Sequence, residues 1–394
     1  MFKFVKITPI KLFFLIPIIL LFLIIRIFID FRIGKIISKK IGHMTTQMEI
    51  YICEKKDYPN RTPVIWFFEK RIANQFLKKK WSQKLFVLPR HILEPIYILL
   101  NKYKIFNFFL IDISKYSGEV KKTIKERLKQ IDEKNVLLRY KPSIEFNNEE
   151  RQEGENYLKK IGFQNKKFFT FASRTSEFHN EKEESIRNSN IDDKILGIKF
   201  LVSKGYKAIR MGKNETKRLN FSDSNIIDYG ISNDRSDFLD IYLSSQCEFI
   251  IASSTGITEL GTLFRKPKLV INEYGVHAMP VNQLRWMILL KKVKNINTGK
   301  LISFEEIYEK KLNYIETDTE LNKLGYSIID NNKLEIKKAS ENFFYLVKGD
   351  FDLDEILQKQ KKYWEIIEKY FEYKNKYKTI ICPEFYKNNI DLFC

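Results

Sequence analysis

Short apolar runs alternate with longer amphipathic stretches between residues 168 and 272, and this alternation constrains the fold more than any other feature of the chain. The sequence predicts strands in KKFFTFASR, YKAIRMG, SNIIDYG, CEFIIASS and KPKLVIN, and helices in ENYLKKIGF, NIDDKILGIKFLVSKG, SDFLDIYLSSQ and GITELGTLF. Strands that alternate with helices are typical of parallel sheets covered by helices on both faces. We therefore predict an α/β fold with a doubly wound parallel sheet in this region.

The preceding residues show a second, shorter alternation. Strands are expected in FRIGKIISKK, TPVIWFF, KLFVLP and FNFFLIDI, with a turn at Gly42 and His43 and a helix toward Cys53. The polar segment around Pro142 separates the two alternations, and 394 residues exceed what one hydrophobic core usually supports. We predict two Rossmann-like lobes, residues 32–140 and 141–330, and a helical C-terminal extension, residues 331–394, whose apolar stripe packs on a lobe.

Residues 1–31 are predicted to form a membrane anchor helix. An uninterrupted apolar run from Leu12 to Ile25 has basic residues on both flanks, and no small-residue cleavage site follows it. The uncharged run is shorter than the ~20 residues that cross a bilayer, so a span and a shallow anchor are both open. Basic residues on both flanks leave the orientation open as well.

Charge restricts the partners without choosing among them. Lysine and arginine number 69 against 49 acidic residues, and the net charge of +20 favours phosphates or lipid head groups. The lysines are spread along the chain and no base-stacking or groove-binding motif accompanies them, so no nucleic acid partner is expected. The four cysteines form no CxxC pair and the four histidines form no HExxH motif, so we expect neither a metal site nor a disulfide framework.

The stretch IIASSTGI places small hydroxyl residues and a glycine at the end of a predicted strand, where open parallel sheets bind ligands. The residues concerned are Ser253, Ser254, Thr255, Gly256 and Ile257. They lead into a helix whose first amides lack internal partners and can bind an anion, and Gly256 would let a diphosphate or ribose approach closely. The alternative is that Ser254 or Thr255 only caps the helix, with Glu259 completing the cap.

Three other predicted strand ends carry polar groups: Arg174 after FFTFAS, Arg210 with Gly212 in AIRMG, and Asp228 in NIIDYG. A guanidinium at a strand end can neutralise a diphosphate through paired hydrogen bonds, and Asp228 can contact a base or a ribose. The alternative for Arg210 is a buried structural ion pair with Asp228.

Arg187 and Asn188, in SIRNSN, follow a polar stretch from Ser176 to Ser185 that shows no apolar periodicity. Such a stretch is typical of an active-site flap. We therefore add Arg187 and Asn188 to the candidate donor-binding residues.

The motifs FASRTSEFHN, SIRNSN, LVSKGYKAIRMG, IIDYG, SDFLDIYLSSQCEFIIASSTGI and LFRKPKLVIN resemble, in order and spacing, a bacterial family of glycosyltransferases found with surface polysaccharide genes. The resemblance runs from about Arg32 to Asn331 and includes KKIGHMTTQMEIYI. It implies a GT-B-like architecture, in which a nucleotide sugar lies between two Rossmann-type lobes. Thr175 stands where the family usually has an aspartate, so a mechanism with that aspartate as base is not open to this chain.

The resemblance and the strand-end residues together predict transfer of a sugar from a nucleotide-diphosphate sugar, bound in the second lobe, to a surface glycan or lipid-linked acceptor. We expect no metal or cofactor, because helix amides and guanidiniums can stabilise the departing diphosphate. His43 is the candidate catalytic base for an inverting reaction. The expected location is the bacterial inner membrane, with the lobes in the cytoplasm. The alternatives are a sugar-nucleotide epimerase, which would need no acceptor, and a basic membrane-associated binding protein.

Overall fold

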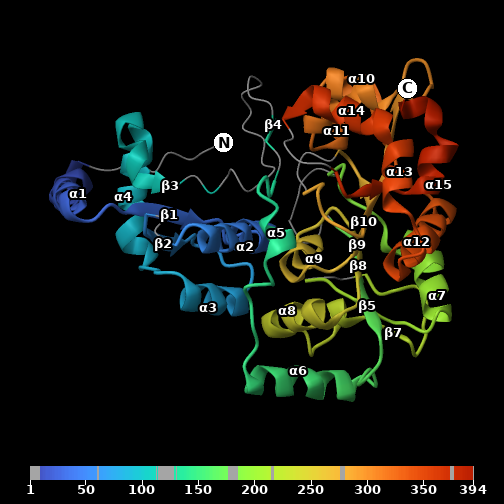
Figure 1. Ribbon diagram of the computed structural model, residues 1–394, viewed down its shortest axis with the longest axis horizontal. Helices are drawn as coiled ribbons and strands as arrows, with labels where there is room; N and C mark the ends of the chain where they lie inside the picture. Colours follow the sequence, from blue (N-terminus) through green and yellow to red (C-terminus); the bar gives the residue numbers. More distant parts are fainter. Residues whose placement is uncertain are drawn as a thin grey trace.

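The structure, a computed structural model, describes residues 9–59, 62–111, 113, 128–129, 131–175, 185–213, 217–275, 280–372 and 377–393. Figure 1 shows a smaller N-terminal lobe, drawn in blue, beside a larger lobe that runs from green to red. The flap expected between Ser176 and Ser185 lies outside the described residues, except for Ser185 itself.

The larger lobe is built on a seven-stranded sheet in the order β14-β10-β9-β8-β5-β6-β7. The strands are β5 (Phe168–Ala172), β6 (Lys207–Arg210), β7 (Ile226–Ile227), β8 (Ile250–Ser253), β9 (Lys268–Glu273), β10 (Trp286–Leu290) and β14 (Ile380–Ile381). Every neighbouring pair is parallel. From β5 the sheet grows one way through β6 and β7 and the other way through β8, β9 and β10. The predicted doubly wound sheet is therefore confirmed, and its order reverses between β5 and β8.

Helices cover both faces of this sheet. Figure 1 shows α8 (Asp237–Gln246) and α9 (Thr258–Phe264) on the side toward the smaller lobe, and α7 (Ile195–Ser203) and α12 (Lys333–Lys348) on the opposite side. All residues of β5 and β9 are buried, as expected for strands covered on both faces. The helix α6 (Asn148–Lys160) leads into β5 and begins with a capping box.

The residues after Asn331 are mainly helical and pack on the larger lobe. Besides α12 they form α13 (Leu353–Lys359), α14 (Lys361–Tyr370) and α15 (Pro383–Asn388), while β14 joins the sheet beside β10. Tyr363, Trp364 and Ile367 are buried, so the apolar stripe of α14 faces the core. An antiparallel pair of strands, β11 (Lys292–Asn295) and β12 (Tyr326–Ile329), and the helices α10 (Phe304–Glu309) and α11 (Asp318–Lys323) lie between β10 and α12 in the chain.

The smaller lobe has a parallel three-stranded sheet in the order β2-β1-β3. Its elements are β1 (Arg32–Ile36), α2 (Ile41–Asp57), β2 (Val64–Phe68), α3 (Gln75–Lys84), α4 (Arg90–Lys102) and β3 (Leu110–Ile111). The strand predicted in KLFVLP is wrong, since Val87 forms only an isolated bridge with Trp66. The run lies between the end of α3 and Pro89, the N-cap residue of α4, and Pro89 has no N–H with which to extend the pairing. Among the described residues of the strand predicted in FNFFLIDI only β3 forms, because the residues before it belong to the 3-10 helix η1 (Lys104–Phe109). A short helix, α5 (Val136–Arg139), follows, and β4 (Leu128–Lys129) pairs with β13 (Phe371–Glu372).

The N-terminal segment is described from Pro9 onward, as the helix α1 (Pro9–Phe28), and residues 1–8 of the predicted anchor lie outside the described residues. Phe22, Leu23 and Ile25 pack against the smaller lobe. Over the described part of the chain, no helix has both the length and the apolar character needed to cross a membrane.

Candidate functional site

The switch point of the larger sheet lies between β5 and β8, where a crevice opens at the carboxyl ends of the two strands. Arg174 follows β5, and its backbone N–H donates to the Ser253 hydroxyl at the end of β8 over 2.8 Å. The carbonyl oxygen of Arg174 accepts from the Ser189 N–H at 3.1 Å. The structure thus joins two predicted site residues, Arg174 and Ser253, at the position where doubly wound sheets bind ligands.

A second arginine reaches the same loop. Arg187 is exposed, and its Nη2 donates to the carbonyl oxygen of Ser254 over 2.9 Å. Beneath this contact lies Glu273, the last residue of β9, which is buried. Burial raises the pKa of Glu273 to about 7, although Arg187 and a hydrogen bond from Ser254 act in the opposite direction. The loop after β8 therefore lies between a guanidinium and a carboxyl group that can exchange a proton near neutral pH.

The hydroxyl groups of the loop after β8 shape its turn. The Thr255 hydroxyl accepts from the Ile257 N–H at 3.0 Å, and the Thr258 hydroxyl donates to the Ser253 carbonyl oxygen at 2.9 Å. The Thr255 contact is a turn before the helix and not a cap, because α9 begins at Thr258 and its N-cap residue is Ile257. Glu259 completes no capping box, because its carboxylate accepts from Thr46 of the smaller lobe and from Thr262.

The close approach expected at Gly256 is present, and the group that approaches belongs to the smaller lobe. A Cβ on Gly256 would lie 2.5 Å from Ile41 Cγ2 and 3.2 Å from the Gly42 nitrogen. Ile41, Gly42 and His43 form the first turn of α2, so the separate turn predicted at Gly42 and His43 is wrong. The N-terminus of this helix touches the loop after β8. His43 follows directly, and its Nδ1 lies 3.1 Å from Gln47 Nε2, a contact that orients the ring.

Arg210, Gly212 and Asp228 form a separate cluster at the ends of β6 and β7. Arg210 is buried, with Nη1 3.1 Å from Asp228 Oδ2 and 2.6 Å from the Lys217 carbonyl oxygen. This is the buried ion pair that was the alternative for these two residues. The Gly212 carbonyl oxygen accepts from Arg235 Nε at 3.0 Å.

Sequence reasoning missed a buried lysine beneath the switch point. Lys194 is fully buried, and its Nζ donates to the Ser173 hydroxyl and, over 2.9 Å, to the Ser189 hydroxyl. Burial lowers the pKa of Lys194 to about 7. Asn272, with a left-handed φ of 53°, also donates to the Ser189 hydroxyl at 2.9 Å. These contacts hold the residues next to Arg174 and Asn188 in place.

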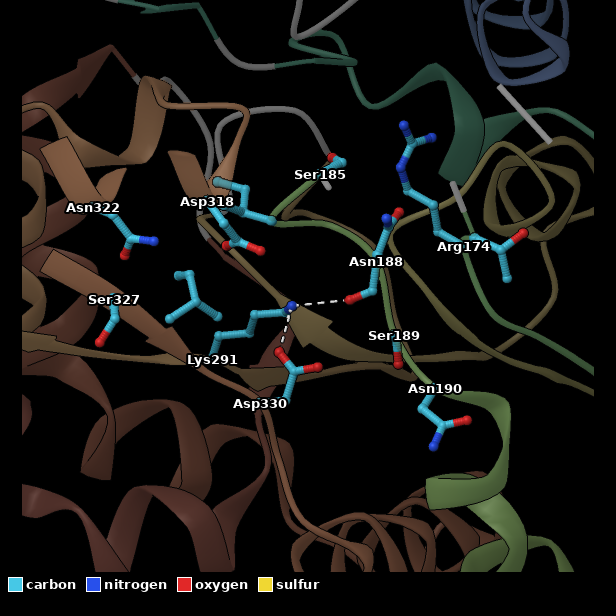
Figure 2. Close-up of a pocket in the computed structure, with 13 residues that line it drawn as sticks. Arg174, Ser185, Asn188, Ser189, Asn190, Lys291, Asp318, Asn322, Ser327 and Asp330 are labelled. Atoms are coloured by element: carbon cyan, nitrogen blue, oxygen red, sulfur yellow. Dashed lines mark hydrogen bonds and ion pairs between the residues drawn. The ribbon is translucent and has the colours of Figure 1, made fainter. Parts of the chain in front are cut away.

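A cavity of about 700 Å³ opens beside the switch point (Figure 2). Its lining residues are Arg174, Thr175, Ser185, Ile186, Asn188, Ser189, Asn190, Lys291, Asp318, Asn322, Ser327, Ile328 and Asp330. Lys291 Nζ lies 2.6 Å from Asp330 Oδ1 and donates to the Asn188 carbonyl oxygen at 3.1 Å. The strand-end rule could have found Lys291, because it follows the apolar run WMILL directly.

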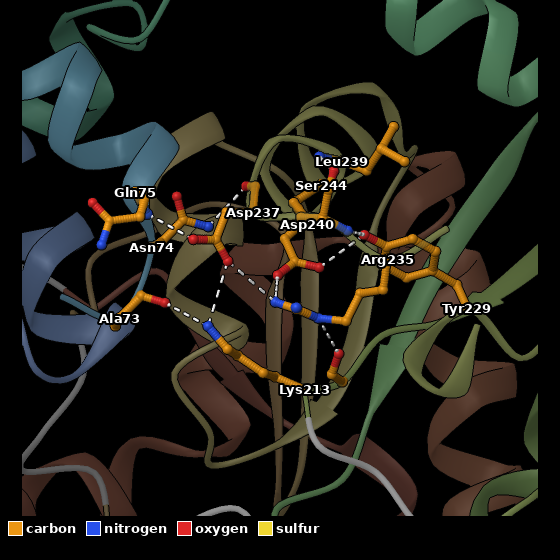
Figure 3. A network of polar contacts seen from close by, with 12 residues as sticks. Ala73, Asn74, Gln75, Lys213, Tyr229, Arg235, Asp237, Leu239, Asp240 and Ser244 are labelled. Carbon is orange, nitrogen blue, oxygen red and sulfur yellow. Dashed lines mark hydrogen bonds and ion pairs between the residues drawn. The ribbon is translucent and has the colours of Figure 1, made fainter. Parts of the chain in front are cut away.

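The two lobes also meet at the start of α8 (Figure 3). The Asp237 carboxylate accepts from the Gln75 N–H at 2.7 Å, and Asn74 Nδ2 donates to the Asp237 carbonyl oxygen at 2.8 Å. Lys213 Nζ donates to the Ala73 carbonyl oxygen at 3.0 Å. Together with the packing of α2 on α9, this network fixes the position of the smaller lobe on the larger one.

Metal-binding side chains do not gather in the described ranges. Within them, no group of three or more His, Cys, Asp or Glu residues is placed to hold a metal ion.

No protein-family model and no curated protein matches the chain. Solved structures with a similar arrangement include a glycosyl transferase family 9 protein from Veillonella parvula, with 12% identity, a TM-score of 0.45, and coverage of 81% of this chain and 98% of its own. The E. coli ADP-heptose LPS heptosyltransferase II is 10% identical with a TM-score of 0.39, and the match covers 66% of this chain and 90% of that protein. The S. aureus protein MnaA, solved with UDP, is 11% identical with a TM-score of 0.39, and the match covers 88% of this chain and 100% of that protein. At these identities and TM-scores, the likenesses assign neither activity nor ligand to this chain.

Proposed function

We propose that this chain is a GT-B-like glycosyltransferase that moves a sugar from a nucleotide-diphosphate sugar to a surface glycan or lipid-linked acceptor. One observation carries the proposal. Arg174 and Arg187 of the larger lobe adjoin the loop after β8 at the switch point, and Ile41 and Gly42, at the start of α2 in the smaller lobe, touch Gly256 of the same loop. In this proposal the arginines bind the diphosphate and His43, which follows Gly42 in the chain, takes the proton.

The donor diphosphate is assigned to the arginines. Arg174 is half-buried and Arg187 is exposed, so both can reach a ligand in the crevice. Departure of the nucleoside diphosphate leaves negative charge on its terminal phosphate, and guanidiniums fixed beside the crevice stabilise that charge without reorganisation. In this proposal the arginines supply the positive charge, and a metal ion is not required.

The acceptor hydroxyl is assigned to the side of the smaller lobe. If the reaction inverts the anomeric centre, a base must take the proton of the acceptor hydroxyl, and His43, which follows Gly42 in the first turn of α2, is the candidate. The contact between His43 and Gln47 holds the imidazole in one orientation, which a general base needs.

The N-terminal helix is assigned to the cytoplasmic face of the bacterial inner membrane, where a lipid-linked acceptor would be found. Its support is the apolar face that α1 leaves exposed: Leu20, Leu21, Ile24, Ile27 and Phe28 are 53%, 54%, 54%, 78% and 81% exposed. Such a face, on a protein with a net charge of +20, suits an anionic bilayer surface. Sedimentation with phosphatidylglycerol vesicles tests this, and an Ile27→Ser, Phe28→Ser variant that sediments like the wild type would contradict it.

A binding panel tests the donor assignment on the full chain in detergent. We expect one of the UDP, GDP, CMP or dTDP sugars to raise the melting temperature, and Arg174→Ala and Arg187→Ala each to weaken that ligand by about tenfold, the effect of one hydrogen bond to a charged group. Arg151→Ala, on the exposed surface of α6, is the matched control. Equal affinities in all three variants would contradict the assignment. Turnover of the nucleotide sugar without an acceptor would indicate an epimerase instead.

A further inference from the structure

The cavity beside the switch point has an unusual lining. Its described walls carry carboxylates from Asp318 and Asp330, three asparagine side chains and several hydroxyl groups, and no aromatic ring. Figure 2 shows Arg174 on one side of the cavity and Asp318, Asn322 and Ser327 on the opposite side. A volume of about 700 Å³ suits a small organic ligand. One ligand can therefore touch Arg174 at one end and the carboxylates at the other.

A buried lysine makes the acidic wall rigid. The Lys291 side chain is 2% exposed and pairs with Asp330, whose side chain is 42% exposed. Nζ of Lys291 also holds the Asn188 carbonyl oxygen, so one cation positions both a carboxylate and the loop across from it. An ion pair with one exposed partner contributes little net stability, because solvent screens the attraction. Its clearest effect here is to fix the direction of polar groups that line the cavity.

The chemistry of the lining selects a class of ligand. Carboxylates accept hydrogen bonds from hydroxyl groups, and asparagine amides both donate and accept, so together they match a ring that carries several hydroxyls. A nucleobase would be expected against flat apolar or aromatic faces. A diphosphate would need positive charge at this end, but Lys291 is already paired with Asp330 and Asp318 adds a negative charge. Neither of these fits the end formed by Asp318 and Asp330.

We propose that this cavity binds the sugar ring of the donor, with the diphosphate at Arg174 and the sugar hydroxyls at Asp318, Asn322 and Asp330. The inference rests on the proposed function, since it places one part of the nucleotide sugar. It makes the cavity the part of the site that discriminates between sugars.

The test compares two ligands by isothermal titration calorimetry on the full chain: the nucleotide sugar from the panel and its bare nucleoside diphosphate. Asp318→Asn and Asn322→Ala remove partners on half-buried or exposed positions of α11, so both variants should fold, and Asp350→Asn at an exposed position after α12 is the matched control. We expect Asp318→Asn, which removes a charged hydrogen-bond partner, to weaken the nucleotide sugar by about tenfold, and Asn322→Ala, which removes a neutral one, to weaken it by about fivefold. Both variants should leave the affinity for the bare diphosphate within about twofold.

Two results would overturn the inference while the proposed function stands. If the bare diphosphate weakens as much as the nucleotide sugar, the cavity holds the nucleoside. If neither ligand weakens although the wild type binds both, the cavity is not part of the donor site. A wild-type chain that binds no member of the panel would refute the proposed function and the inference with it.

Discussion

Gly256→Ala tests what the loop after β8 touches. The added methyl carbon would lie 2.5 Å from Ile41 Cγ2, whereas carbon atoms in contact prefer about 3.5–4.0 Å. The loop and α2 must therefore move apart by about 1 Å, and overpacking of this kind typically costs about 1–3 kcal/mol. The second contact, 3.2 Å to the Gly42 nitrogen, can be relieved by a shift of a few tenths of an ångström. We expect Gly256→Ala to lower the melting temperature by a few degrees.

Ile41→Ala supplies the compensating change. Ile41→Ala removes the Cγ2 atom that the new methyl group would contact. Adding Gly256→Ala to the Ile41→Ala variant should therefore lower the melting temperature by less than adding it to the wild type. Differential scanning calorimetry of the four proteins gives this coupling directly, because residues in contact show non-additive effects. Calorimetric titration with a nucleoside diphosphate supplies the second readout. If Gly256→Ala melts like the wild type, loses the ligand, and is not rescued by Ile41→Ala, the space at Gly256 belongs to the donor and the reasoning is refuted.

Two further predictions concern buried cations. The pKa of Lys194 is about 7 in the folded chain, against an ordinary value of 10.5. Between these two pH values the unfolded chain binds a proton that the folded chain has released. The contribution of Lys194 to the free energy of unfolding therefore rises with pH above 7, by at most about 1.4 kcal/mol per pH unit. Lys194→Met should reduce that slope in denaturation midpoints measured from pH 7 to 9, and an unchanged slope would contradict the assigned burial. Arg210→Ala leaves Asp228 without its cation and should cost about 3 kcal/mol or more. It should weaken a nucleoside diphosphate no more than the nucleoside, and a selective loss of the diphosphate would show that Arg210 contacts the donor.

The alternation of apolar runs predicted the centre of the larger sheet because each strand there is buried on both faces and reads as a continuous apolar run. The edges were harder to predict. Strand β14 pairs with β10 across about ninety residues of chain, and two residues of apolar sequence carry no signal of that partner. The run KLFVLP shows the opposite failure, since it is apolar enough for a strand yet makes only the bridge between Val87 and Trp66. Periodicity reports burial, and pairing depends on which strand the fold brings alongside.

The residues of the candidate site also divide into those that the sequence could predict and those that it could not. Arg174 and Ser253 could be predicted because the carboxyl ends of parallel strands meet at one edge of a sheet, and this holds for any doubly wound order. The occupant of the space at Gly256 could not be predicted, because a glycine shows that something approaches closely without showing what. Lys194 was missed for a different reason. Lys194 lies at the start of a helical stretch in a chain with 69 lysines and arginines, so the sequence predicts an exposed surface residue. Its burial follows from the fold.

Two buried titratable groups, Lys194 and Glu273, adjoin the proposed diphosphate site. Lys194 has hydroxyl groups rather than a carboxylate as its hydrogen-bond partners, and the charges of Asp193 and Asp330 offset only part of the effect of burial on its pKa. Lys194, near Arg174, and Glu273, near Ser254, both have a pKa of about 7. Below that pH Lys194 gains positive charge and Glu273 loses negative charge, and both changes make the crevice more positive. A bound diphosphate would favour the same two protonations, so the switch point combines fixed arginine charge with two groups whose charge can follow the ligand.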